Sequence, residues 1–134
     1  MKTIEVAAGL IQQDGRYLIA KRKPGVHLGG FWEFPGGKRE LGETLEECLR
    51  RELLEELNVR IEIPLPFRLI RHEYQDRTVE IHFFRCYIEE GQPRPLDSDE
   101  VRWVSPQELP HYRFPPADQA IIDALQLEAP RAAR

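Results

Sequence analysis

The sequence predicts an α/β fold in which a mixed β-sheet is packed between helices. Short apolar segments bounded by turn residues, which are typical of strands, occur on both sides of one long helical segment. A second helical segment follows near the C-terminus. No linker or internal repeat separates these segments, so we expect a single domain over residues 1–134.

The chain is expected to begin with a β-hairpin. Residues 3–11 favour a strand, Asp14-Gly15 is a hairpin turn signal, and residues 17–20 favour the returning strand. The basic residues at 21–23 come next. They are either a solvated strand end or a contact for the phosphates or base of a ligand.

A glycine-rich loop is expected between this hairpin and the long helix. Residues 24–38 contain five glycines and two prolines, with a short strand expected at 32–34. Pro35-Gly36-Gly37 predicts a tight turn. Glycine lets the backbone approach a ligand closely, so a carbonyl here could bind a metal ion.

Residues 45–57 predict the principal helix. They contain no glycine, proline or β-branched residue. Thr44 can cap the helix, and Glu47 completes an S/T-x-x-E capping box. At about 100° per residue one arc of this helix is apolar, and we expect it to face the core. The arc contains Leu45, Cys48, Leu49, Leu53 and Leu57.

Three glutamates lie inside this arc or at its edge. Glu52, Glu55 and Glu56 have i, i+3, i+4 spacing, which brings their side chains together on one side of the helix. Carboxylates crowded near a core repel one another and lose solvation, and a hard divalent cation such as Mg²⁺ or Mn²⁺ relieves both costs. The alternative is an ordinary solvated acidic face.

The remainder of the chain is expected to complete the sheet. Strands are expected at 59–63, 67–74, 77–88 and 101–104, and helices at 105–109 and 117–127. Residues 89–99 predict a polar loop, and we expect the tail after Glu128 to fray.

Composition narrows the possible partners. The chain is 41% hydrophobic and 31% charged, with a net charge of −4, which favours free nucleotides over a nucleic acid polymer. We expect no membrane segment and no signal peptide. Cys48 and Cys86 lack metal-like spacing and are expected to be reduced and structural, as in the cytoplasm.

The stretch from Gly37 to Val59 resembles the Nudix box, G-x5-E-x7-R-E-U-x-E-E-x-G-U, where U is aliphatic. Asn58 replaces the late glycine, a mild change because asparagine also tolerates the left-handed conformation that ends a helix. The other eight fixed positions match, which makes the pattern specific. They are Gly37, Glu43, Arg51, Glu52, Leu53, Glu55, Glu56 and Val59.

The resemblance extends over nearly the whole chain and is closest to MutT-like Nudix hydrolases, which cleave nucleoside triphosphates to the monophosphate and pyrophosphate. It implies the Nudix fold, an α/β/α sandwich around a mixed sheet. It also implies a Mg²⁺ cofactor, or Mn²⁺, and a role for Arg51 in orienting a box carboxylate. The implied metal ligands are Glu52, Glu55, Glu56 and the Gly36 carbonyl.

The family also uses an acidic residue from the loop before a late strand. We assign Glu100 to this position, as metal ligand or base, with Asp97 and Asp99 as competitors. Glu52 is our choice of general base over Glu100. Solvated loop charges are the alternative for all three loop residues.

Substrate recognition is expected to involve Arg22, His27, Phe34 and Asp118. Asp118 stands where MutT-like proteins hold the purine with an amide. An ionised carboxylate can only accept hydrogen bonds, so it favours a base edge rich in N–H donors. Alternatively, Asp118 is a helix N-cap, His27 an exposed loop residue and Phe34 a core residue.

The predicted function is metal-dependent hydrolysis of 8-oxo-dGTP, which sanitises the nucleotide pool and so serves DNA repair. CTP or a 5-substituted dCTP is the second candidate substrate. A non-catalytic Nudix-fold binding module is the alternative of another class, although such modules generally lack an intact box. We expect a monomer or a homodimer.

Overall fold

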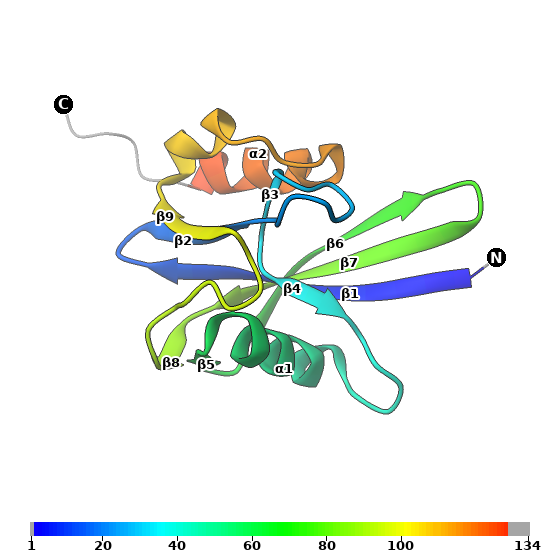
Figure 1. Ribbon diagram of the computed structural model, residues 1–134, viewed down its shortest axis with the longest axis horizontal. Helices are drawn as coiled ribbons and strands as arrows, with labels where there is room; N and C mark the ends of the chain where they lie inside the picture. The colour runs from blue at the N-terminus through cyan, green and yellow to red at the C-terminus, as the bar shows by residue number, and fades with distance from the viewer. Residues whose placement is uncertain (1, 129–134) are drawn as a thin grey trace.

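The computed structural model describes residues 2–128 and confirms a mixed sheet between helices (Figure 1). The tail that was expected to fray lies outside these residues. The strands are β1 (Lys2–Gln13), β2 (Arg16–Lys21), β3 (Trp32–Glu33), β4 (Gly36–Lys38), β5 (Arg60–Ile61), β6 (Leu65–Glu73), β7 (Arg77–Cys86), β8 (Ile88–Glu90) and β9 (Glu100–Val104). The α-helices are α1 (Leu45–Leu57) and α2 (Gln119–Glu128), and 3₁₀ turns occupy Pro106–His111 and Pro116–Asp118.

Strand β1 is the centre of the sheet. It runs parallel to β7 from Lys2 to Ile11 and antiparallel to β4 over Val6 to Ala8. Strand β6 pairs antiparallel with β7, and β2 pairs antiparallel with β1, β3 and β9. Parallel and antiparallel pairs therefore coexist, as expected for a mixed sheet.

Helices α1 and α2 lie on opposite sides of the sheet (Figure 1). Side chains of β1 alternate between the two sides, as strand geometry requires. Ala8 and Leu10 pack in the cluster that includes α2, whereas Ala7 and Ile11 pack in the cluster that includes α1. Both faces of the sheet are thus buried, which is why β1 and β2 contain continuous apolar runs.

Helix α1 forms as the sequence predicts. The Thr44 hydroxyl accepts from the Glu47 N–H at 3.0 Å, and the Glu47 carboxylate accepts from the Thr44 N–H at 2.8 Å. The helix ends at Asn58, which adopts the left-handed conformation with φ of 59°. Of the predicted apolar arc, Cys48, Leu49, Leu53 and Leu57 are buried, and Leu45 is partly buried.

The two cysteines are buried and unpaired, as expected. Burial raises the pKa of the Cys48 thiol to about 11 and that of the Cys86 thiol to about 12. Both therefore remain protonated at neutral pH and act as small apolar side chains.

The prediction of a tight turn at Pro35-Gly36-Gly37 is wrong, because Gly36 and Gly37 belong to β4. A Cβ on Gly36 would lie 1.9 Å from the Ala7 carbonyl oxygen, so only glycine permits this close pairing with β1. Elsewhere the expected elements are modified: the strand expected at 77–88 is interrupted at Tyr87, and the helix expected at 105–109 is a 3₁₀ turn. The strand expected at 59–63 is reduced to β5 before Pro64.

Candidate active site

Arg51, in the middle of α1, is the centre of an ion-pair network. It donates from Nη2 to Oε1 of Glu43 at 2.8 Å and from Nε to Oε2 of Glu43 at 3.1 Å, a bidentate pair. Its Nη1 donates to Oε1 of Glu52 at 2.9 Å. The guanidinium lowers the pKa of Glu43 to about 2, and the pKa of Arg51 is raised in turn.

The carboxyl group of Glu52 lies directly against the backbone of β4. A Cβ on Gly37 would lie 2.4 Å from the carboxyl carbon of Glu52, so the glycine provides the space that this carboxyl occupies. Burial raises the pKa of Glu52 even though Arg51 opposes the shift. The carboxyl is therefore partly desolvated but held in place.

Glu56, one helical turn further along α1, is the most perturbed carboxyl of the site. Burial raises its pKa to about 8, and the negative charges of Glu52, Glu33 and Asp97 add to the shift. The nearby backbone of Gly36 opposes the rise in pKa. Glu55 is different, because its side chain is 60% exposed.

A cleft with a volume of about 150 Å³ opens beside Glu56. It combines carboxylates with two basic side chains and a glycine backbone, the groups needed to bind a cation and an anion together. Its lining residues are Arg22, Lys23, Val26, Glu33, Gly36, Glu56 and Asp97.

The structure brings Asp97, rather than Glu100, next to Glu56. Asp97 lines the cleft and lies 3.8 Å from the Lys23 ammonium nitrogen. Glu100 begins β9 opposite Lys21 and forms an ion pair with Arg102. The role expected of Glu100 stays a prediction, and Asp97 is the competitor that the geometry favours.

Arg22 is held by the loop that follows it. Its Nε donates to the His27 carbonyl oxygen at 2.7 Å, and its Nη1 donates to Oε1 of Glu33 at 2.9 Å. The His27 side chain itself is exposed. Arg22 thus positions the loop and presents part of its charge to the cleft.

The other expected substrate residues are buried. Phe34 is 5% exposed and packs against Phe114, with ring centroids 5.1 Å apart, so it is a core residue beside the cleft. Asp118 is 8% exposed, and burial, with a smaller contribution from Glu33, raises its pKa to about 7.

Glu33 is a site residue that the sequence reasoning missed. It contacts Arg22, lines the cleft, and raises the pKa of both Glu56 and Asp118. Burial raises its own pKa. A carboxylate between two aromatic residues was the available signal.

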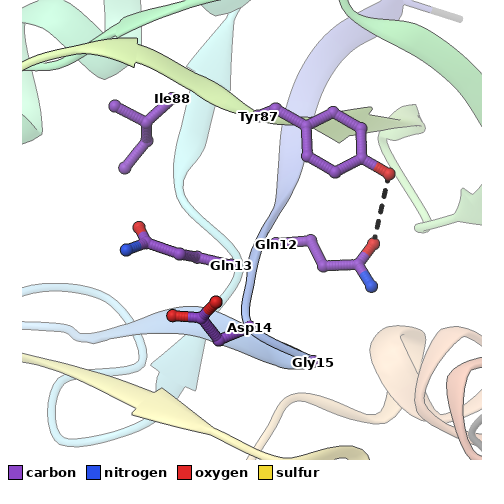
Figure 2. A pocket seen from close by; sticks show the side chains of 6 residues that line it. All are labelled: Gln12, Gln13, Asp14, Gly15, Tyr87 and Ile88. Carbon is purple, nitrogen blue, oxygen red and sulfur yellow. Dashed lines mark hydrogen bonds between the residues drawn. The ribbon is translucent and has the colours of Figure 1, made fainter.

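A second hollow, of about 310 Å³, lies between the β1–β2 turn and the residues after β7 (Figure 2). Figure 2 shows Tyr87 directed toward Gln12, with 3.5 Å between the Tyr87 hydroxyl and Oε1 of Gln12. Among the residues that line this hollow, Asp14 is the one with a carboxyl group, and none of them was expected to bind substrate or metal. The smaller cleft beside Glu56 therefore remains the candidate active site.

The donor set beside α1 fits a hard divalent cation. Glu52 and Glu56 offer oxygen atoms, both have raised pKa values, and their negative charges interact. Oxygen ligands are those that Mg²⁺ and Mn²⁺ prefer, and a cation at this place would favour the ionised carboxylates.

No helix within residues 2–128 combines the length and apolar character needed to cross a membrane.

Comparison with known proteins places the chain in a family. The NUDIX domain family matches residues 6–124. The chain is 34% identical over 134 residues to the CTP pyrophosphohydrolase of Escherichia coli K12, a match that covers 100% of the chain and 98% of that relative. It is 32% identical over 127 residues to the 8-oxo-dGTP diphosphatase of the same organism, covering 94% of the chain and 98% of that relative.

Solved structures with the same fold include two bacterial proteins. The E. coli ORF135 protein superposes with a TM-score of 0.82 at 32% identity, covering 95% of this chain and 91% of that one. A MutT structure from work on Aliivibrio salmonicida and Vibrio cholerae superposes with a TM-score of 0.80 at 29% identity, covering 93% and 97%. From its box and from these matches, the chain belongs to the NUDIX domain family.

Proposed function

We propose that this Nudix hydrolase cleaves a modified nucleoside triphosphate, with 8-oxo-dGTP as the first candidate, to the monophosphate and pyrophosphate. The observation that carries the proposal is the pair of desolvated carboxyls, Glu52 and Glu56, packed against the β4 glycines beside two cationic side chains. This arrangement suits a metal-bound triphosphate. We further propose that the reaction sanitises the nucleotide pool in the cytoplasm.

The proposed ligands of Mg²⁺, or Mn²⁺, are Glu52, Glu55, Glu56 and the Gly36 carbonyl, with Asp97 or Glu100 from the loop. When bound, the cation would neutralise phosphate charge and lower the pKa of a water molecule. Arg51 would keep Glu52 oriented through the 2.9 Å contact, and Glu52 would accept the proton of the attacking water. Lys23 and Arg22 would bind phosphate oxygens at the mouth of the cleft.

Asp118 is the proposed base-recognition residue. With a pKa of about 7, its carboxyl is present in both protonation states near neutral pH. The neutral form both donates and accepts a hydrogen bond, and the ionised form only accepts. Guanine offers N1–H and N2–H donors, so either form can bind an oxidised guanine.

A cytosine nucleotide is the second candidate, and a specific observation favours it. The exocyclic amine of cytosine can donate to a carboxylate, and one relative, whose match covers 100% of the chain, is a CTP pyrophosphohydrolase. A binding module without catalysis is less consistent with the molecule, since Arg51, Glu52, Glu55 and Glu56 are all in place.

The test is pyrophosphate release with Mg²⁺ for 8-oxo-dGTP, dGTP, CTP, 5-methyl-dCTP, ADP-ribose and a dinucleoside tetraphosphate. We expect the highest kcat/KM for 8-oxo-dGTP. A preference for the cytosine nucleotides would establish the second candidate instead, and no turnover of any compound would support the binding module. Asp118→Asn should change the ratio of the two best kcat/KM values by about tenfold, on the order of one hydrogen bond.

A further inference from the structure

A second group of potential metal ligands lies outside the cleft, on strands β1 and β7. Within residues 2–128, the one trio of His, Cys, Asp or Glu whose ligand atoms all lie within 4.8 Å of one another is Glu5, Glu80 and His82. Glu5 is the register partner of Glu80, and Ala7 is the register partner of His82. Because side chains alternate along a strand, all three project from the α1 side of the sheet, as Ala7 does.

The imidazole of His82 has an unusual environment. Its Nε2 atom is buried and has no hydrogen-bond partner in the described structure. The nearest carboxylate oxygen, Oε2 of Glu5, is 3.8 Å away, too far for a hydrogen bond. Buried polar atoms normally have partners, so this nitrogen points to a missing ligand between the imidazole and the carboxylates.

The two carboxylates are already oriented by arginines. Arg39 donates to Oε1 of Glu5 at 2.8 and 3.0 Å, and Arg71 donates to Oε2 of Glu80 at 3.1 Å. A carboxylate held through one oxygen can still offer the other to a cation, and hydrogen-bonded ligands of this kind are usual around metal ions. The side chains of Glu5, Glu80 and His82 are 32%, 21% and 24% exposed, so the trio lies near the surface although Nε2 of His82 is itself buried.

We propose that Glu5, Glu80 and His82 bind a divalent cation of the Zn²⁺ class, with water at the fourth position. Zn²⁺ accepts mixed nitrogen and oxygen ligands at about 2.0–2.2 Å, which places neighbouring ligand atoms about 3.3 Å apart in a tetrahedron. The ligand atoms lie farther apart than this, with 3.8 Å between Nε2 of His82 and Oε2 of Glu5 and up to 4.8 Å within the trio, so the side chains must move closer together to bind the ion. Mg²⁺ prefers oxygen ligands alone, so this site and the site beside α1 select different ions.

The proposed site is joined to the box by one arginine. Arg39 binds Glu5 and also donates from Nη1 to the Glu43 carbonyl oxygen at 3.1 Å. Glu43 in turn binds Arg51. A cation at Glu5 would therefore fix the segment that leads into α1, and its binding does not depend on the proposed hydrolysis.

Equilibrium dialysis against Zn²⁺ in excess Mg²⁺ tests the proposal, since Mg²⁺ occupies sites that have oxygen ligands only. We expect stoichiometric binding by the wild type and affinity at least about tenfold weaker in His82→Gln and in Glu80→Gln. Loss of a residue that only hydrogen-bonds to a metal ligand already weakens metal affinity by about tenfold or more, and these variants lose a ligand itself. The matched control is His72→Gln on β6, an exposed histidine outside the trio, which should bind as the wild type does.

Imidazole NMR gives an independent readout. Zn²⁺ should shift the Nε2 resonance of His82 more than those of His27, His72 and His111. Each variant is first checked for native circular dichroism without zinc, and Glu80→Gln serves if His82→Gln does not fold. Unchanged affinity in a folded variant, competition by Mg²⁺, or no shift at His82 would overturn the proposal.

Discussion

The carboxylates at the two ends of the box, Glu43 and Glu56, lie in opposite electrostatic environments. Glu43, just before the helix, pairs with Arg51, which lowers the pKa of Glu43 to about 2. Near the end, Glu56 lies among Glu52, Glu33 and Asp97, and its pKa is raised to about 8. Glu43 is therefore ionised and paired with an arginine, whereas desolvation and repulsion from neighbouring carboxylates favour the protonated form of Glu56 when no cation is bound.

The difference indicates that Glu43 helps to orient the site, whereas Glu56 is suited to bind the cation. A carboxylate that is fully paired with an arginine contributes orientation and has little attraction left for a cation. A desolvated carboxyl beside other carboxyls costs stability, and a bound cation removes that cost. The following predictions test whether the two ends really divide these tasks, starting with the largest expected effect.

Glu56→Gln should nearly abolish activity, because it removes a proposed metal ligand while keeping the side-chain shape. We expect kcat/KM with Mg²⁺ to fall by roughly 10²–10³-fold, about 3–4 kcal/mol of transition-state stabilisation. Glu46→Gln, on the exposed first turn of the same helix, is the matched control and should remain near wild type. If Glu56→Gln were as active as the wild type, Glu56 would not be a metal ligand.

The metal-free protein should become less stable as the pH rises. The folded pKa of Glu56 lies above its ordinary value of 4.5, so this group's contribution is complete below about pH 4.5 and is lost as the pH passes through about 8. Thermal unfolding with a chelator should show Tm falling over this window. Mg²⁺ should raise Tm more above pH 8 than at pH 6, and an equal rise at both values would argue against ionised Glu56 as a ligand.

Glu43→Gln should have the smallest effect of these changes, and its effect on Tm should depend on pH in the opposite direction to the contribution of Glu56. Because the folded pKa of Glu43 lies below 4.5, its stabilising contribution is present above about pH 4.5 and is lost as the pH falls through about 2. The variant should therefore have a lower Tm than wild type at neutral pH, with the difference shrinking in acid. Glu40→Gln is the control, since Glu40 lies 3.7 Å from Arg51 and is 70% exposed. A Tm difference that does not change with pH would show that the Arg51 pair is not its source.

The sequence predicted the helical part of the site well. The capping box at Thr44, the buried arc and the left-handed Asn58 all follow from local rules. The turn expected at Gly36 and Gly37 was wrong because the hydrogen-bonding partner of these residues is β1, about thirty residues earlier in the chain, and such pairing leaves no local periodic signal.

The loop carboxylates show a second limit of sequence reasoning. Glu100, Asp97 and Asp99 are neighbours in the chain, and their residue types are equally suited to a metal or base role. Asp97 lines the cleft because the loop leads it past Lys23, whereas Glu100 has already entered β9. Which one faces Glu56 depends on the path of the backbone, which residue type does not specify.

By itself, the sequence determined the long helix, the box with its glutamates, and the likeness to the Nudix family. Those depend on spacing along one segment, where 3.6 residues per turn places side chains without reference to other elements. The tertiary structure decided that Glu43 is paired with an arginine while Glu56 lies among other carboxylates, and that Glu5 lies next to His82. Solvation and Coulomb interactions depend on which atoms from distant segments surround a charge, and only the folded chain brings those atoms together.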